Sequence, residues 1–175
     1  YSEYTSNYPL WEALAGYASE KGLGLQLHLA EARNEVDSCL DRTGMTPGEL
    51  LACHRLFAVP ATAAGCAYLE PEEAKMLGKK KASAVALPLS AAKNGQHCAP
   101  ITDLVKAGMN VALGTDGAIQ AGNLDMFEVM RGAAMSVRAA TEDPSALPSS
   151  AALLMATYCG AQAQGRSREC GMLKE

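Results

Sequence analysis

Leu23-Gly-Leu-Gln-Leu-His-Leu29 and Asn110-Val-Ala-Leu-Gly-Thr-Asp-Gly117 are the two stretches that decide the fold of this chain. Each is an apolar run of strand-like length that ends in a side chain able to bind a metal, His28 in the first and Asp116 in the second. Parallel α/β proteins gather their catalytic groups at the carboxyl ends of buried strands. The two stretches therefore predict a parallel sheet with both polar clusters on one active-site face.

Around these stretches, predicted strands alternate with predicted helices. The apolar patterns predict strands at residues 23–29, 62–69, 83–87 and 110–115. Helices are expected at residues 9–22, around 36–40, from 46 to about 56, and at 70–81, 101–107, 124–140 and 148–164, with a loop at 88–100. This alternation implies a parallel sheet with right-handed crossovers. Because a closed (β/α)8 barrel needs about 250 residues, the 175 residues predict half a barrel or a small open sheet.

Composition excludes several classes of protein. With 49% hydrophobic residues the chain can bury a core, and one domain is expected. The net charge of −4 argues against a nucleic-acid partner, and the single basic run, Lys79-Lys80-Lys81, is expected to be a solvated helix end. The six scattered cysteines suit reduced thiols in a cytoplasm or organelle matrix. Neither a membrane span nor a signal peptide is apparent.

Several motifs resemble the amidohydrolase superfamily. Asn110-Val-Ala-Leu-Gly-Thr-Asp-Gly117, followed by Asn123-Leu-Asp-Met-Phe-Glu-Val-Met-Arg131, resembles the last barrel strand and the next helix of that family. His28-Leu-Ala-Glu31 with Glu35 is similar to its fifth-strand motif. The branch most similar contains S-adenosylhomocysteine, guanine and cytosine deaminases and triazine chlorohydrolases. The resemblance covers residues 10–173.

The resemblance implies a fold and a domain organisation. The chain would be the parallel-stranded carboxyl half of a TIM-type (β/α)8 barrel, equivalent to strands five to eight. Residues 1–175 would form one partial domain, with the first barrel half and the flanking β-sandwich absent. Such a half exposes strand edges and apolar faces, so we expect a second copy or other protein chains to cover them.

The resemblance also implies roles for three residues. His28 and Asp116 would be ligands of a divalent zinc or iron ion, which lowers the pKa of a bound water. Asp116 would also accept a proton from that water, and Glu31 would transfer a proton to the ring nitrogen or leaving group of a small heterocyclic substrate. The expected reaction is hydrolysis of a C–N or C–Cl bond.

The sequence departs from the family pattern at several positions. The only histidines are His28, His54 and His97, so the paired first-strand histidines of the family are missing. Gly65 replaces the usual sixth-strand histidine, and Leu87 and Ala91 are apolar where the family has polar groups. His97, in a loop near the site, could reach the cavity or be an ordinary exposed histidine, and His54 is expected at the surface. Cys66 and Cys98 lie near the site in sequence, where inert buried thiols are expected.

Three hypotheses follow. The chain is part of a working hydrolase or deaminase whose missing ligands come from elsewhere, in which case the isolated chain has negligible activity. Alternatively, it is a degenerate, catalytically inactive structural subunit of a larger assembly, as Gly65 and the missing histidine pair suggest. Thirdly, it binds a small heterocycle or amide without turning it over, which the low aromatic content of 5% disfavours.

Overall fold

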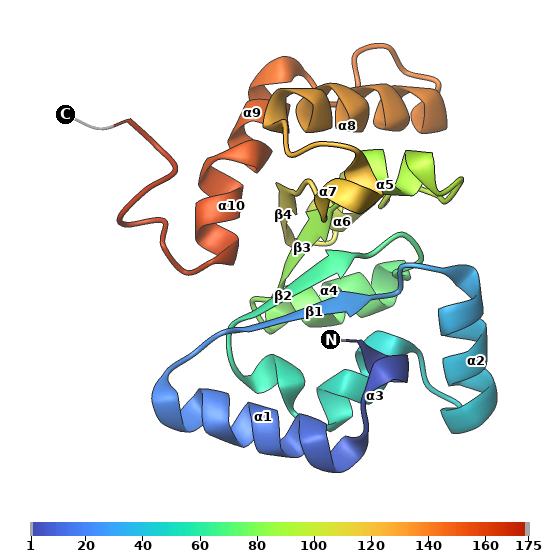
Figure 1. Cartoon of the computed structure of the whole chain (residues 1–175), viewed down its shortest axis with the longest axis vertical. Coiled ribbons are helices and arrows are strands. Elements are labelled where there is room, and N and C mark those ends of the chain that lie inside the picture. Colours follow the sequence, from blue (N-terminus) through green and yellow to red (C-terminus); the bar gives the residue numbers. More distant parts are fainter. Residues whose placement is uncertain (1, 174–175) are drawn as a thin grey trace.

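The computed structural model describes residues 2–173 and shows a four-stranded sheet surrounded by helices (Figure 1). The strands are β1 (Leu25–Leu29), β2 (Ala61–Gly65), β3 (Ser83–Ala86) and β4 (Asn110–Leu113). The first part of the chain contains the helices η1 (Glu3–Thr5), α1 (Tyr8–Lys21), α2 (Arg33–Thr43), α3 (Pro47–Cys53), η2 (Leu56–Ala58) and α4 (Pro71–Lys79). The remainder contains α5 (Pro88–Lys93), α6 (Ile101–Lys106), α7 (Ala118–Ala121), α8 (Met126–Thr141), α9 (Ser149–Ala156) and α10 (Tyr158–Ala163).

The order of the strands distinguishes a barrel from an open sheet. All pairs are parallel, and the order is β1-β2-β3-β4, so each strand pairs with the next one along the chain. Doubly wound open sheets reverse their strand order at a switch point, whereas a barrel adds strands in sequence. Together with the helices between the strands, this order is that of half a (β/α)8 barrel, as the sequence predicts.

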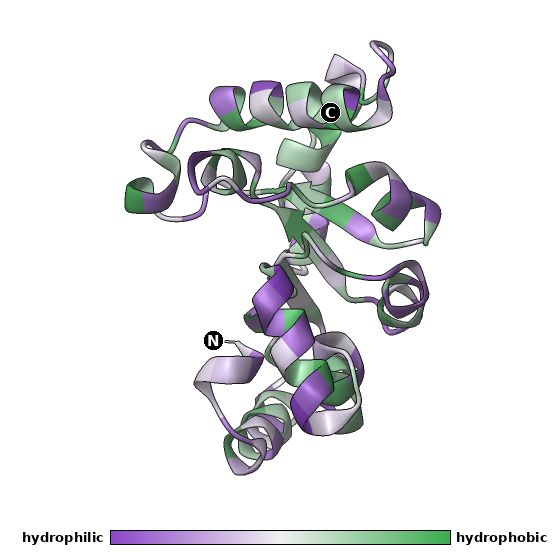
Figure 2. Cartoon of the chain, turned by 90° about the vertical axis from the view of Figure 1, so that its right-hand side faces the viewer, coloured by the Kyte–Doolittle hydropathy of each residue, from purple (hydrophilic) through white to green (hydrophobic). Residues whose placement is uncertain are grey.

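The two faces of the sheet differ in composition. Side chains alternate across a strand, and the register places Leu27, Ala63, Ala84 and Val111 in one row that is buried in the main core. The opposite face contains His28, Ala64, Val85 and Ala112, which line a cavity of about 390 Å³. Figure 2 shows that the central strands are mainly hydrophobic, while hydrophilic and hydrophobic residues alternate along the surrounding helices.

Helix α10 covers the amino-terminal end of that opposite face. The Thr62 hydroxyl donates to the Ala163 carbonyl (3.0 Å), and the Asn110 amide donates to Ser83 Oγ and to the Cys159 carbonyl, both at 3.0 Å. Figure 1 shows α10 on the side from which the strands start and α2 on the side to which the arrows point. The sheet therefore has one end closed by a helix of its own chain.

Most predicted elements are confirmed, with four corrections. The helix expected from residue 46 to about 56 ends at Cys53, because Arg55 has a left-handed φ of 63°, and Leu56 begins the separate helix η2. The strand expected at residues 62–69 ends at Gly65, because Gly65 and Cys66 both have positive φ, 91° and 56°, and turn the chain out of the sheet. The loop expected at residues 88–100 contains α5, which begins at Pro88. The helix expected at residues 148–164 is two helices, α9 and α10, since Thr157 has non-helical angles. No helix among residues 2–173 is long and apolar enough to cross a membrane.

Candidate active site

A tight turn after β1 brings the side chains of Glu31 and His28 together. Ala30 has a left-handed φ of 49°, which reverses the chain as it leaves the strand. The buried carboxylate of Glu35 fixes this turn, since it accepts hydrogen bonds from the backbone N–H groups of Ala30 (2.9 Å) and Glu31 (2.8 Å). Glu31 Oε1 then lies 2.7 Å from His28 Nδ1. The motif thus forms a fixed imidazole–carboxylate pair.

Asp116 follows β4 in a similarly constrained conformation. Its φ is 60°, in the left-handed region that is costly for a residue with a side chain, although Asp and Asn tolerate it best. Its carboxylate accepts a hydrogen bond from the buried Ser90 hydroxyl (2.7 Å) and another from the Gly117 N–H (2.8 Å). These two bonds fix the orientation of Asp116.

His28, Glu31 and Asp116 line one cavity of about 500 Å³ at the carboxyl ends of the strands. Most other side chains around it are polar and uncharged: Tyr4, Asn34, Ser38, Ser90, Asn94, Gln96 and Gln120. Pockets that bind small molecules typically have volumes of about 300–1,000 Å³. The cavity is therefore large enough for a substrate with several hydrogen-bonding groups.

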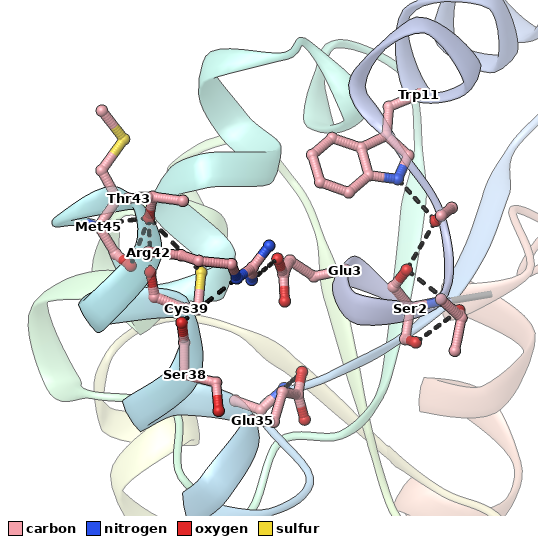
Figure 3. A network of polar contacts seen from close by, with 12 residues as sticks. Ser2, Glu3, Trp11, Glu35, Ser38, Cys39, Arg42, Thr43 and Met45 are labelled. Carbon is pink, nitrogen blue, oxygen red and sulfur yellow. Dashed lines mark hydrogen bonds and ion pairs between the residues drawn. The ribbon is translucent and has the colours of Figure 1, made fainter.

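One wall of this cavity comes from the amino-terminal segment. Tyr4 of η1 lines the cavity, and the neighbouring Glu3 is fully buried and forms an ion pair with Arg42 of α2. Figure 3 shows Glu3 pointing towards α2, with Arg42, Cys39, Ser38 and Glu35 on the facing helix. The Trp11 indole donates to Ser6 Oγ (2.7 Å), which joins α1 to the same segment. The Glu3–Arg42 ion pair attaches the segment to α2, the helix that also contributes Asn34 and Ser38 to the cavity wall.

The contact between His28 and Glu31 changes the pKa of His28. The pKa of His28 is raised, chiefly because its ring is hydrogen-bonded to Glu31. Burial acts in the opposite direction and lowers this pKa. The negative charges of Glu31, Asp116 and Glu35 raise it further. Burial raises the pKa of Glu35, although backbone hydrogen bonds act in the opposite direction. The site therefore stabilises the protonated form of the His28 imidazole relative to the same group in water.

The other sequence candidates lie outside the main cavity. His97 is exposed and packs edge-on against the Tyr68 ring, with 5.8 Å between centroids. His54 ends α3, stacks on Tyr8 (4.4 Å between centroids) and lies 3.1 Å from Glu12. Burial raises the pKa of Cys98 to about 11 and that of the fully buried Cys66 higher still. Both cysteines are thiols at neutral pH, which makes them poor metal ligands.

The described residues do not form a complete metal site. A catalytic zinc ion generally has three protein ligands. Within residues 2–173 there is no group of three or more His, Cys, Asp or Glu side chains that could hold a metal ion. His28 and Asp116 line the same cavity but supply at most two ligands, and Glu31 engages His28 Nδ1. These residues alone therefore do not fit a catalytic zinc ion.

Sequence reasoning did not identify the supporting groups of this site. In the sequence Glu35 is only part of a motif, and Ser90 carries no pattern that marks it, yet both hold candidate catalytic residues in place. Tyr4 and Gln120 carry no such signal in the sequence, because isolated polar residues in helices and loops look like ordinary surface positions. For Asn34 and Ser38, the helical spacing of four residues next to the motif was the available signal.

The fold and the cavity together define part of a (β/α) barrel with a cluster of imidazole and carboxylate groups at the carboxyl ends of its strands. The chain belongs to the amidohydrolase family, whose model matches residues 1–175.

Known proteins similar to the chain include deaminases and triazine hydrolases. It is 41% identical over 161 residues to the 5-methylthioadenosine/S-adenosylhomocysteine deaminase of Moorella thermoacetica, a match that covers 92% of this chain and 38% of that protein. The structure of a zinc-bound adenosine deaminase from Xanthomonas campestris is similar with a TM-score of 0.93 and 29% identity, over 98% of this chain and 39% of that one. A guanine-bound guanine deaminase from C. acetobutylicum has a TM-score of 0.85 and 25% identity, with 97% and 41% covered. The chain thus spans about two fifths of the length of these proteins.

Proposed function

We propose that this chain is part of a metal-dependent hydrolytic deaminase that acts on an amino-substituted heterocycle such as a purine nucleoside. The observation that best supports the proposal is the cavity of about 500 Å³ lined jointly by His28, Glu31 and Asp116. The deaminases that it resembles, which include adenosine and guanine deaminases, support this substrate class. In the net reaction, water adds to the ring carbon, the C–N bond to the amino group breaks, and ammonia leaves.

The chain's own residues have distinct roles in this proposal. Asp116, held by Ser90 and by the Gly117 N–H, accepts a proton from the attacking water. Glu31, fixed beside His28, transfers a proton to the ring nitrogen or to the departing amino group. The polar side chains of α2 and η1 on the cavity wall hydrogen-bond the remainder of the substrate.

The proposed metal requires ligands beyond these residues. His28 and Asp116 would be two of its ligands, and histidines outside this sequence would complete the set, because a catalytic zinc needs about three protein ligands. We propose that residues 1–175 form one partial barrel domain. Other polypeptide, either the remainder of a longer chain or a second subunit, would pair with the edge strands β1 and β4.

Activity of the full natural polypeptide tests this function. We expect ammonia release from 5′-methylthioadenosine, S-adenosylhomocysteine or guanine with zinc present, and its loss after chelation. The E31Q and D116N variants should each lose at least about 100-fold in kcat/KM, whereas residues 1–175 alone should show negligible turnover. Absence of turnover in the metal-loaded natural polypeptide would refute the proposal.

A second candidate function is that of an inactive structural subunit. Gly65 favours it, because the strand end next to Glu31 has no polar side chain. This candidate predicts that the E31Q and D116N variants leave assembly unchanged and that no metal binds. Metal content of the natural polypeptide, measured by elemental analysis, separates the two candidates.

A further inference from the structure

Gly65 lies directly beside the Glu31 side chain. It is the last residue of β2 and pairs with Leu29 of β1, two residues before Glu31. A Cβ atom on Gly65 would lie 2.3 Å from Glu31 Cγ, 3.2 Å from Cδ and 3.1 Å from Oε1. The Glu31 side chain therefore occupies the space that any side chain at position 65 would need.

Glu31 cannot relieve such a collision by a small movement. Its backbone is fixed by the Glu35 carboxylate, which accepts the N–H groups of Ala30 and Glu31. The colliding atom, Cγ, is the second carbon of the side chain, so relief requires rotation about χ1, which moves the whole carboxylate. The cavity that Glu31 shares with Gly65 and Gln96 measures only about 20 Å³, whereas the main cavity measures about 500 Å³. A displaced Glu31 would enter the main cavity and leave His28.

We infer that Gly65 is a positioning residue, whose lack of a side chain allows the Glu31 carboxylate to lie against His28 Nδ1. The absence of a side chain at Gly65 therefore has a structural effect of its own, because it leaves room for Glu31 beside His28. Its consequence for catalysis rests on the proposed function, but the contact itself does not.

The test compares two glycine variants in the full natural polypeptide. Gly65 and Gly122 have nearly equal positive φ angles, 91° and 93°, but a Cβ on Gly122 would meet no atom within 4 Å. G65A and G122A thus both place an alanine at a positive φ of nearly the same size, and only the Cβ of G65A collides with Glu31. We expect the NMR signals of the His28 ring nitrogens in G65A to shift to those of E31Q, while G122A retains the wild-type signals. Persistence of the wild-type His28 signals in G65A would overturn the inference.

Double variants separate the collision from the backbone conformation. E31A lacks Cγ, so G65A should reduce stability less in that background than it does in the wild-type background. If E31A/G65A fails to fold while E31A/G122A folds, the backbone alone requires glycine, and the inference is wrong.

Kinetics provide the functional readout. If Glu31 transfers the proton, kcat in G65A should fall by about 100-fold, close to the value for E31Q, with G122A near wild type. A G65A enzyme with normal kcat would contradict a positioning role. If no form of the protein deaminates its substrate and G65A still shifts the His28 signals, the proposed function fails and the positioning role remains.

Discussion

The two ends of the sheet are built differently. At the carboxyl end, Ala30, Cys66 and Asp116 have left-handed φ angles of 49°, 56° and 60°, one after each of β1, β2 and β4. At the amino end, Thr62 and Asn110 hydrogen-bond to carbonyls of α10. Left-handed conformations of residues with side chains cost free energy and cluster at functional sites. From this comparison we expect changes at the carboxyl end to affect activity most and changes at the amino end to affect stability most.

The largest effect is expected for the D116N variant at the carboxyl end, and it should be a loss of activity. Asn tolerates the left-handed backbone, and its single amide oxygen can still accept a hydrogen bond from either Ser90 or Gly117, but it cannot accept a proton from water. We expect kcat/KM to fall by about 10²–10⁴-fold, and the thermal midpoint to move by no more than about 3 °C. Steady-state kinetics and thermal unfolding of the same preparations measure both. A D116N protein that loses much stability and little activity would contradict a catalytic role for the carboxyl end of the sheet.

The complementary change at the amino end is N110A. It removes the amide that donates to Ser83 Oγ and to the Cys159 carbonyl, and leaves both acceptors without that donor. We expect a loss of about 1–3 kcal/mol in the free energy of unfolding, measured with urea, and kcat within about twofold of wild type, since Asn110 lies at the end remote from the site. An inactive but stable N110A protein would contradict the comparison.

A smaller effect is expected in the pH dependence of stability. The pKa of His28 is raised above 6.5, chiefly by Glu31. A raised folded-state pKa contributes stability that is fully present below the unfolded pKa and is lost as the pH rises through the folded value. The stability advantage of chelator-treated wild type over E31Q should therefore be greatest below pH 6.5 and decline above it. Urea unfolding from about pH 5.5 to about pH 8.5 tests this, and an advantage that grows with pH would contradict it.

Much of the fold could be predicted from the sequence because its signals are local. Apolar runs placed the four strands within a few residues, and Pro71 with its flanking acids marked the start of α4. The errors arose where a single residue decides the backbone. Gly65 ends β2 early, Pro88 begins a helix in an expected loop, and Thr157 divides the last helix.

The candidate site was less predictable, because its contacts join distant segments. His28, Glu31 and Asp116 could be grouped in advance, since carboxyl ends of parallel strands share one edge. The Ser90–Asp116 bond spans 26 residues, and the fit of Glu31 beside Gly65 depends on tertiary packing. Neither leaves a periodic pattern in the sequence.

The most direct test of the central claim is the position of a metal in crystals of the full natural polypeptide, located by anomalous scattering at the zinc edge. The account predicts an ion at the carboxyl ends of the strands, with His28 and Asp116 among its ligands. An ion bound elsewhere, or one held there without either of these residues, would contradict it.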